Sequence, residues 1–396
     1  MKLIHCADLH LDSRLTNLRE EEAGMRRAEL LASFPRLAER AEREKAAAVL
    51  ISGDLFDADT VSRQAENAFL DTVRMHPGIL FFYLRGNHDR SGFSTEKIPE
   101  NLKLFGRRWR TYVLEEPEEV RAEEPAGAQG ENATGKQLEK HSGPFFRPVA
   151  VTGAELDAEN AALLPDTLSL DPHRFNIVML HGQIRDSGSG SGAQTIPLPE
   201  YRNRNIDYLA LGHVHSYEEG ALAPGGIWCY PGCLEPRGYD ECGRHGFVLL
   251  ETGQTFRHCF VPFAVREVHA LSADVTGCAS TGEMAERIRG ALKQLEESGA
   301  GIPESDFLKI VLRGRLDVGA EKNLLLLERQ FSDRFSGVRV EDRTAFSVRY
   351  EEYGMEATLK GEFVRLVRAD ETLTEEEKAE IIRCGIQALG GEEIDL

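Results

Sequence analysis

Arg85-Gly86-Asn87-His88-Asp89 directly follows an apolar run, Ile79 to Leu84, that has the length and aromatic content of a buried strand. A glycine at the end of a strand lets the backbone turn sharply and approach an ion. The polar side chains after it would lie at the carboxyl end of the strand, where open α/β sheets place their sites. Asn87 offers a neutral oxygen to a hard cation, His88 can donate or accept a proton near neutral pH, and Asp89 can orient the His88 ring.

Strands and helices alternate on both sides of this stretch. Apolar runs predict early strands at 2–7 and 48–51, and helical spacing predicts helices at 25–45, with Pro35 as a potential kink, and at 61–75. Further strands are expected at 149–151, 176–180, 208–211, 227–230, 246–250 and 255–261. This order indicates an α/β layer fold with right-handed crossovers and a strand-rich second sheet.

The length of 396 residues is too large for one ordinary core and suggests two or three domains. Residues 1–262 form the predicted α/β domain, in which residues 117–147, rich in Glu, Ala, Gly and Lys, are a solvated insertion. After Pro262, strands and helices alternate through residues 263–352, which predicts a small α+β domain. Residues 353–396 are expected to form a tail of two amphipathic helices.

The composition, with 41% hydrophobic and 29% charged residues, is typical of a globular protein. A formal net charge of −19 argues against broad nonspecific coating of nucleic acid but is compatible with a local basic groove. No apolar run approaches the roughly 20 residues that a membrane span needs, and the first residues resemble a core strand and not a signal peptide. Seven cysteines without a CxxC pair indicate neither a disulfide framework nor a zinc knuckle. We therefore expect a reduced, cytoplasmic setting and no membrane partner.

Five predicted strand ends carry side chains of the metal-ligand type. They are Asp8-Leu9-His10, Gly53-Asp54, Gly86-Asn87-His88-Asp89, His181-Gly182 and Gly212-His213-Val214-His215. Residues two apart in an extended segment face the same side, so the pairs at 8/10 and 213/215 can each converge on one centre. The set exceeds what one ion takes, and it therefore predicts two metal ions about 3.5–4 Å apart. Mixed nitrogen and oxygen donors suit manganese, iron or zinc better than magnesium.

Such a centre has one natural chemistry, the hydrolysis of a phosphoester by an activated water. A protonated His88 would stabilise the transition state or help the leaving alcohol depart. Taken singly, each piece has an ordinary interpretation: Asp8 as a turn residue, and His181 as a satisfied polar residue. The ordered combination of five strand ends is what favours the metal interpretation.

The ordered set resembles the calcineurin-like metallophosphoesterase superfamily, and within it the SbcD-type DNA repair exonucleases, above all the YhaO-like members. The stretches that carry the resemblance are Ile4-His5-Cys6-Ala7-Asp8-Leu9-His10-Leu11-Asp12, Ile51-Ser52-Gly53-Asp54-Leu55-Phe56-Asp57, Leu84 to Asp89, Leu180-His181-Gly182-Gln183, Leu211-Gly212-His213-Val214-His215 and Tyr230-Pro231-Gly232-Cys233-Leu234-Glu235-Pro236. The resemblance covers about residues 1–260, and it reaches the later domain and the tail only by layout.

The resemblance implies a metallophosphoesterase two-sheet α/β sandwich with a small α+β cap domain and a helical tail. It implies one metal bound by Asp8, His10, Asp54 and His215, with Asp54 bridging, and a second completed by Asn87, His181 and His213. His88 would be the catalytic acid, oriented by Asp89. The family usually uses Mn²⁺, with Fe²⁺ or Zn²⁺ as alternatives.

The resemblance also implies two partners, DNA and an SbcC-like SMC-type ATPase. This chain lacks a GxxxxGK[ST] phosphate loop, so ATP hydrolysis is not expected from it. The oligomeric state stays open, with a homodimer among the alternatives. Relatives often carry a histidine, linked to exonuclease activity, where this chain has Asp57. Processivity and strand polarity therefore stay open as well.

We predict a metal-dependent exonuclease or endonuclease acting on DNA in repair. A metallophosphatase or cyclic-nucleotide phosphodiesterase on the same fold is one alternative, and a DNA-binding architectural subunit is another. The extra domain and the tail favour the nuclease, because a small-molecule esterase does not need them. The candidate substrate contacts are Asp57, Arg85, Arg107, Arg108, Arg110, Arg202 and Arg204. The tail helices would bury their apolar faces on their own cap domain or on the coiled coil of the partner.

Overall fold

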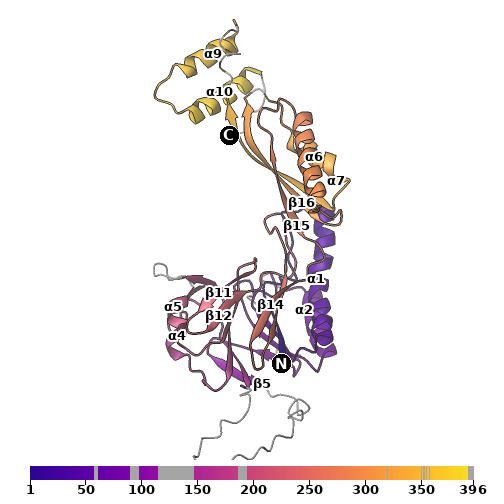
Figure 1. Cartoon of the computed structure of the whole chain (residues 1–396), viewed down its shortest axis with the longest axis vertical. Coiled ribbons are helices and arrows are strands. Elements are labelled where there is room, and N and C mark those ends of the chain that lie inside the picture. The colour runs from indigo at the N-terminus through magenta and orange to yellow at the C-terminus, as the bar shows by residue number, and fades with distance from the viewer. Residues whose placement is uncertain are drawn as a thin grey trace, which may run out of the picture. The chain divides into compact units, whose positions relative to one another are not determined.

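A computed structural model describes residues 1–57, 61–89, 98–114, 147–185, 194–318, 320–348, 350, 353, 355 and 357–390. The chain divides into two compact units, Met1–Val265 and Arg266–Leu396, and the predicted tail is part of the second unit (Figure 1). Apart from Arg147, the predicted insertion at 117–147 lies outside the described residues. Among the residues described, no helix has the length and apolar character needed to cross a membrane.

The first sheet of the first unit has the strand order β14-β13-β1-β2-β3-β4. Its strands are β1 (Lys2–Cys6), β2 (Ala48–Ser52), β3 (Leu80–Leu84), β4 (Leu102–Leu104), β13 (Gly246–Glu251) and β14 (Arg257–Pro262). The four early strands, β1 to β4, run parallel to one another, whereas β13 is antiparallel to β1 and β14 is antiparallel to β13. Helices α1 (Glu20–Arg43), which continues through Pro35, and α2 (Arg63–Met75) connect the parallel strands.

The second sheet has the order β11-β12-β10-β7-β6-β5. Its strands are β5 (Arg110–Leu114), β6 (Val149–Gly153), β7 (Phe175–His181), β10 (Tyr208–Gly212), β11 (Glu218–Leu222) and β12 (Gly226–Tyr230). The inner strands β6, β7, β10 and β12 are parallel to one another, and β5 and β11 pair antiparallel at the two edges. The described part of this unit also contains four short elements, namely β8 (Gln183–Arg185), β9 (Thr195–Pro197), α4 (Leu164–Thr167) and α5 (Leu198–Tyr201).

The strands of the first sheet have continuous apolar sequences because both of their faces are buried. Ile4 and Phe81 pack with Phe34 and Phe69 of the helices in one cluster. Their neighbours in sequence, such as Phe82, point to the other face and pack with second-sheet residues in a second cluster. The second cluster joins the two sheets, and the predicted two-sheet α/β sandwich is therefore confirmed.

The second unit is built on a three-stranded parallel sheet in the order β15-β16-β17. Among the residues described, its elements are β15 (Val268–Asp274), α6 (Thr281–Glu297), β16 (Phe307–Asp317), α7 (Leu324–Ser332), β17 (Gly337–Ser347), α9 (Leu359–Arg368) and α10 (Glu375–Gly390). Ser280 Oγ caps α6 by accepting a hydrogen bond from the Glu283 amide at 3.3 Å. Thr374 and Glu377 exchange the two hydrogen bonds of a capping box at the start of α10.

The two tail helices bury one apolar face within the second unit. Val364 of α9 and Ile382 of α10 are almost fully buried and pack with Val318 and Phe346 near the ends of β16 and β17. Of the two alternatives for the tail, packing on its own domain accounts for this face. Other apolar side chains of the same helices remain exposed, among them Leu359 at 69% and Leu366 at 66%.

Candidate metal centre

The predicted ligands lie where parallel strands of both sheets end. Asp8 and His10 follow β1, Asp54 follows β2, and Asn87 follows β3, whereas His181 ends β7. His213 and His215 follow β10. Backbone hydrogen bonds from Asp8 N to Gly53 O (3.0 Å) and from Gly182 N to Gly212 O (3.1 Å) join neighbouring ends within each sheet. The ends of the two sheets also meet, because His181 Nδ1 lies 2.8 Å from Ser52 O.

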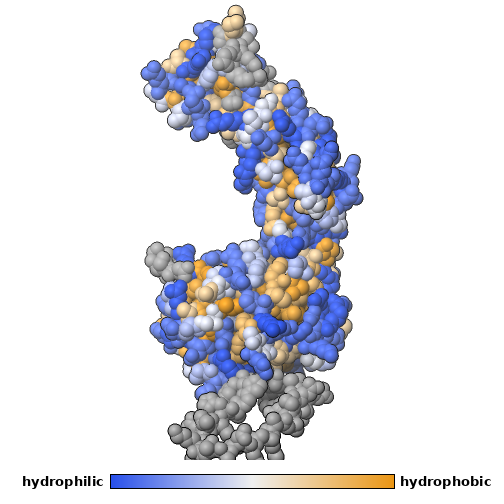
Figure 2. Space-filling model, viewed as in Figure 1, coloured by the Kyte–Doolittle hydropathy of each residue, from blue (hydrophilic) through white to orange (hydrophobic). Residues whose placement is uncertain are grey.

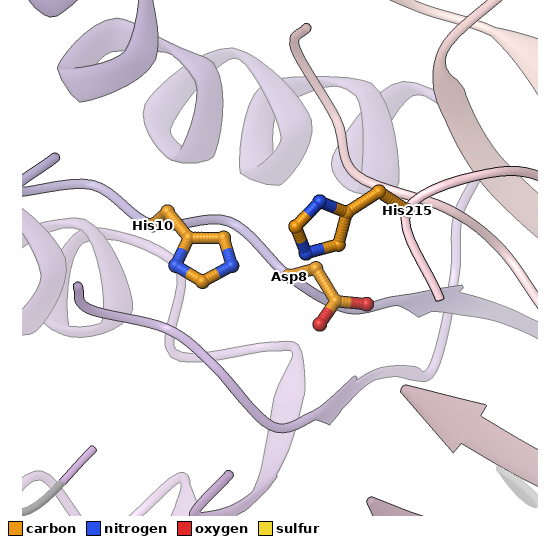
Figure 3. A group of neighbouring side chains, drawn as sticks. All are labelled: Asp8, His10 and His215. Carbon is orange, nitrogen blue, oxygen red and sulfur yellow. The ribbon is translucent and has the colours of Figure 1, made fainter. Parts of the chain in front are cut away.

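Asp8, His10 and His215 form what we call the first half-site. Their ligand atoms all lie within 4.8 Å of one another, and the two ring centroids are 5.2 Å apart. Figure 3 shows the His10 ring to the left of the Asp8 side chain and the His215 ring above it, with a nitrogen of each ring on the side toward Asp8. Both ring nitrogens of His10 are buried; Asp57 Oδ1 lies 3.2 Å from Nδ1, whereas Nε2 has no hydrogen-bond partner among the described residues. Burying polar atoms without partners is unfavourable, so this half-site fits a cation that accepts a histidine nitrogen.

Asp54, Asn87, His181 and His213 form the second half-site. The ligand atoms of Asp54, His181 and His213 lie within 4.8 Å of one another. Asn87 Oδ1 lies 3.0 Å from His181 Nε2 and 3.2 Å from His213 Nδ1. Asp54 Oδ2 lies 3.3 Å from His181 Nε2 and 3.9 Å from His10 Nε2. The Asp54 carboxylate therefore faces both half-sites.

The backbone is strained at four of these residues. Asp8, His10, Asp54 and His213 have φ angles of 53°, 46°, 50° and 109°, in the region that side chains with a Cβ rarely adopt. Such strain persists only where the surrounding structure enforces it, and it is common at functional sites. Gly86 permits a close approach of another kind, because a Cβ there would collide with the Asp54 carboxylate. The sequence predicted a close approach to an ion at this glycine, and the structure places it against the Asp54 carboxylate instead.

Burial and neighbouring charges shift several pKa values in the centre. Burial raises the pKa of Asp8 to about 6 and lowers the pKa of His10 to about 4. Burial alone would lower the pKa of His181, but the Asp54 carboxylate overcomes this and raises it to about 9. The pKa of Asp54 is held below its usual value, because hydrogen bonding and attraction to His181 outweigh its burial. Without a cation, the second half-site therefore holds a proton on His181.

His88 has a different carboxylate partner from the one the sequence predicted. His88 Nδ1 lies 3.0 Å from Asp57 Oδ1, and 46% of the His88 side chain is exposed. Asp89 is buried, and its carboxylate accepts hydrogen bonds from the backbone amides of Leu55, Phe56 and Gly86 at 2.8–3.1 Å. The prediction that Asp89 orients the His88 ring is therefore wrong, since Asp89 fastens the turns after β2 and β3. Asp57, predicted as a substrate contact, occupies the orienting position.

The predicted arginine contacts have mixed surroundings. Arg85 forms a two-pronged ion pair with Glu155, with its closest contact at 2.8 Å, Arg107 pairs with Asp157 and Glu159, and Arg204 pairs with Asp166. Arg110 lies over the ring of Tyr112, and Arg108 and Arg202 are exposed. None of these carboxylates is a predicted metal ligand. Contact of the arginines with DNA stays a prediction.

Sequence reasoning missed two residues that border the centre. Glu241 Oε1 lies 2.7 Å from His215 Nδ1, and Arg237 Nη2 lies 3.1 Å from the same atom. Arg237 Nη1 also lies 3.5 Å from Asp57 Oδ2. Burial would raise the pKa of Glu241, but the hydrogen bond with His215 and the charge of Arg237 lower it to about 2. No local pattern marks these residues, because the irregular chain after β12 brings them to the site.

The family of the chain follows from its sequence match. The profile of the family described as Calcineurin-like phosphoesterase matches residues 1–217, more than half of the chain, and this range contains every residue of both half-sites. This chain belongs to the calcineurin-like phosphoesterase family. It is therefore a hydrolase of the kind that acts on phosphoester bonds with divalent metal ions, and its Asp and His clusters offer sites for such ions.

Three relatives extend the similarity beyond residue 217. The chain is 25% identical to "Uncharacterized metallophosphoesterase YhaO" of Bacillus subtilis over 328 residues, covering 79% of this chain and 72% of the relative. It is 26% identical to "DNA double-strand break repair protein Mre11" of Methanopyrus kandleri, covering 80% and 69%. It is also 26% identical to the SbcD component of the nuclease SbcCD of Rhodobacter capsulatus, covering 79% and 80%. The predicted resemblance to SbcD-type and YhaO-like proteins is therefore confirmed at the level of sequence similarity.

Proposed function

We propose that this protein is a nuclease that hydrolyses phosphodiester bonds of DNA at a dinuclear metal centre. The observation that carries the proposal is the position of Asp54, whose Oδ2 faces His181 at 3.3 Å and His10 at 3.9 Å. A single carboxylate between two sets of nitrogen donors is the arrangement that a bridged pair of ions requires. The His88–Asp57 pair lies beside this carboxylate, since the His88 amide donates to Asp54 Oδ1 at 2.9 Å.

The donor set fits borderline divalent cations. Asp8, His10 and His215 would hold one ion, Asn87, His181 and His213 the other, and Asp54 both. Four imidazole nitrogens favour Mn²⁺, Fe²⁺ or Zn²⁺ over Mg²⁺, and we take Mn²⁺ as the first candidate. When bound, the ions would polarise a phosphate group and lower the pKa of an attacking water.

The residues of the chain supply proton transfer and orientation. His88 Nδ1 lies 3.0 Å from Asp57 Oδ1, so a proton on this nitrogen would face the carboxylate and leave Nε2 to give a proton to the departing alcohol oxygen. Asp57 is itself anchored, because Ser13 Oγ donates to its second oxygen at 2.7 Å. The exposure of His88 leaves its ring open to a substrate.

DNA is the proposed substrate for two reasons. Relatives that share more than two thirds of their length with this chain are named as part of a nuclease and as a DNA double-strand break repair protein. The second unit adds 131 residues that a small-molecule esterase would not need. A metallophosphatase or cyclic-nucleotide phosphodiesterase would use the same half-sites and is the alternative on this fold.

The test is cleavage of end-labelled double- and single-stranded DNA in Mn²⁺, with a nucleotide phosphoester as a parallel substrate. We expect metal-dependent shortening of the DNA, abolished by a chelator and by Asp54→Asn. Hydrolysis of the small phosphoester with both DNA substrates left intact would favour the phosphodiesterase alternative. If neither DNA nor the small phosphoester is hydrolysed with Mn²⁺, Fe²⁺ or Zn²⁺, the protein has an architectural role and not an enzymatic one.

We further propose that the tail docks on an SMC-type ATPase partner. Leu359 and Leu366 lie two turns apart on α9, and Ile381 and Leu389 lie about two turns apart on α10, so each helix keeps an apolar strip at its surface. Figure 2 shows apolar residues among hydrophilic ones on the surface of the second unit. The name of one relative, a component of SbcCD, supports a partner chain of this kind.

A further inference from the structure

His181 and His215 each have an Nδ1 atom that lies against a group outside the half-sites, and the two groups differ. His181 Nδ1 lies 2.8 Å from the backbone carbonyl of Ser52, which belongs to β2. His215 Nδ1 lies 2.7 Å from the side-chain carboxylate of Glu241. A ligand histidine is commonly held through its second nitrogen, which fixes the ring orientation and makes the free nitrogen a better donor. The two half-sites use a backbone atom and a side chain for the same task.

We infer that Glu241 is a positioning residue, which holds His215 so that Nε2 of the ring is directed at the first half-site. The inference rests on the proposed metal binding but not on DNA as the substrate. In Figure 3 a nitrogen of the His215 ring points toward Asp8. An Nδ1–H donated to Glu241 leaves Nε2 as the free lone pair on that side.

Glu241 is itself held from several directions, as a positioning residue must be. Its Oε2 accepts a hydrogen bond from the Arg237 amide at 2.6 Å and lies 3.5 Å from the Cys233 thiol. Arg237 Nε lies 3.3 Å from Oε1. Cys233 is in turn 3.1 Å from His245 Nδ1, and His245 Nε2 is 3.1 Å from the Glu241 carbonyl. Oε1 of Glu241 therefore faces both His215 and the Arg237 side chain, while Oε2 holds the Arg237 backbone amide.

Arg237 connects this arrangement with the His88–Asp57 pair. Its guanidinium group lies 3.5 Å from Asp57 Oδ2 and 3.3 Å from Glu241 Oε1. A planar guanidinium can contact two carboxylates at once, which a lysine ammonium does less well. Asp57, beside the proposed acid His88, and Glu241, beside His215, thus both contact the Arg237 guanidinium group.

The experiment compares Mn²⁺ binding to the full chain by titration calorimetry in wild type, Glu241→Gln and Glu241→Asp. A glutamine has only one acceptor oxygen, so it cannot serve both His215 and the Arg237 amide. We expect two sites in wild type, and a loss of about 10–100-fold in affinity at one of them in Glu241→Gln. Glu241→Asp should recover part of that loss, because it keeps two acceptor oxygens. The electron spin resonance of Mn²⁺ at intermediate loading should change from that of a coupled pair to that of a single ion.

Glu235→Gln is the matched control, because Glu235 lies in the same segment. Its carboxylate is buried and pairs with Arg26 at 3.1 Å and Arg36 at 3.0 Å, neither of which is a metal ligand. This variant should keep both Mn²⁺ affinities even if its melting temperature falls. If wild type binds two ions and Glu241→Gln binds both equally well, the inference is overturned while the proposed metal centre stands. If wild type binds no metal, both are overturned.

Discussion

The two half-sites contain similar donors but are secured by different parts of the structure. In the second half-site, His181 is almost fully buried and its ring is held by the Ser52 carbonyl of a central strand. In the first, 27% of the His215 side chain is exposed and its ring is held by Glu241. A strand carbonyl cannot be removed by a side-chain substitution, whereas a carboxylate can. Two half-sites with similar donors can therefore be secured differently. One histidine is held by the backbone of the core, and the other is held by a side chain that a substitution can change.

Removing the Asp54 carboxylate, which faces both half-sites, should weaken metal binding at both of them. Asp54→Asn is expected to lower Mn²⁺ content at both and to reduce phosphodiester cleavage by at least about 10³-fold, since metal ions contribute several kcal/mol and each 1.4 kcal/mol is a factor of ten. Elemental analysis and a cleavage assay on the same preparation measure both effects. Asp71→Asn, on the exposed face of α2 where Asp71 pairs with Arg74, is the control. Two full metal equivalents retained in Asp54→Asn would exclude a bridging role.

Changing the proposed acid should leave both half-sites intact. His88→Asn is expected to keep two Mn²⁺ ions and to lower DNA cleavage by about 10²–10⁴-fold. A phosphodiester with a p-nitrophenol leaving group should be affected much less, because that group departs without a proton. Asp57→Asn should show the same dependence on the leaving group with a smaller loss. Equal losses on both substrates would mean that the pair maintains the site and does not transfer a proton.

The half-sites should differ in how metal binding depends on pH. His181 must lose the proton that its raised pKa of about 9 retains, so binding to the second half-site should strengthen by up to about tenfold per pH unit until about pH 9. Asp8 has a pKa raised to about 6, so the first half-site should gain affinity only up to about pH 6 and then level off. Calorimetry at pH 7.5 in buffers of different ionisation enthalpy should therefore detect about one proton released, from the second half-site. Binding without proton release at that pH would contradict the charge assigned to His181.

Substitutions on the exposed strip of the tail should leave the centre unchanged. Leu359→Glu combined with Leu366→Glu is expected to alter stability by no more than about 0.5 kcal/mol per site and to leave Mn²⁺-dependent cleavage at the wild-type rate. The same pair should prevent co-purification with an SMC-type ATPase. Ile382→Ala, in the buried face of α10, is the contrasting variant and should cost about 2–5 kcal/mol of stability in the second unit. Retained co-purification in the double variant would show that the partner binds elsewhere.

The sequence by itself predicted the long buried strands, their ends and the candidate ligands, but not short or edge strands such as β4, β5 and β11. Apolar runs such as Phe81 and Phe82 mark strands buried on both faces, and a ligand directly after a strand is placed by that strand alone. The spacing of Asp8 and His10, or of His213 and His215, is equally local. These features were predictable because each depends on a few neighbouring residues and on one rule of backbone geometry.

Only the tertiary structure decided which groups hold these ligands in place. Asp89 and Asp57 both follow strands, yet Asp89 bonds the amides after β2 while Asp57 meets His88, because β2 and β3 lie side by side. Glu241 reaches His215 through irregular chain that no periodicity describes. A carboxylate binds whichever donor the fold brings within reach, and that choice depends on the path of the whole chain. The candidate ligands lie at strand ends and can be predicted from the sequence, whereas their partners are determined only by the packing of the two sheets.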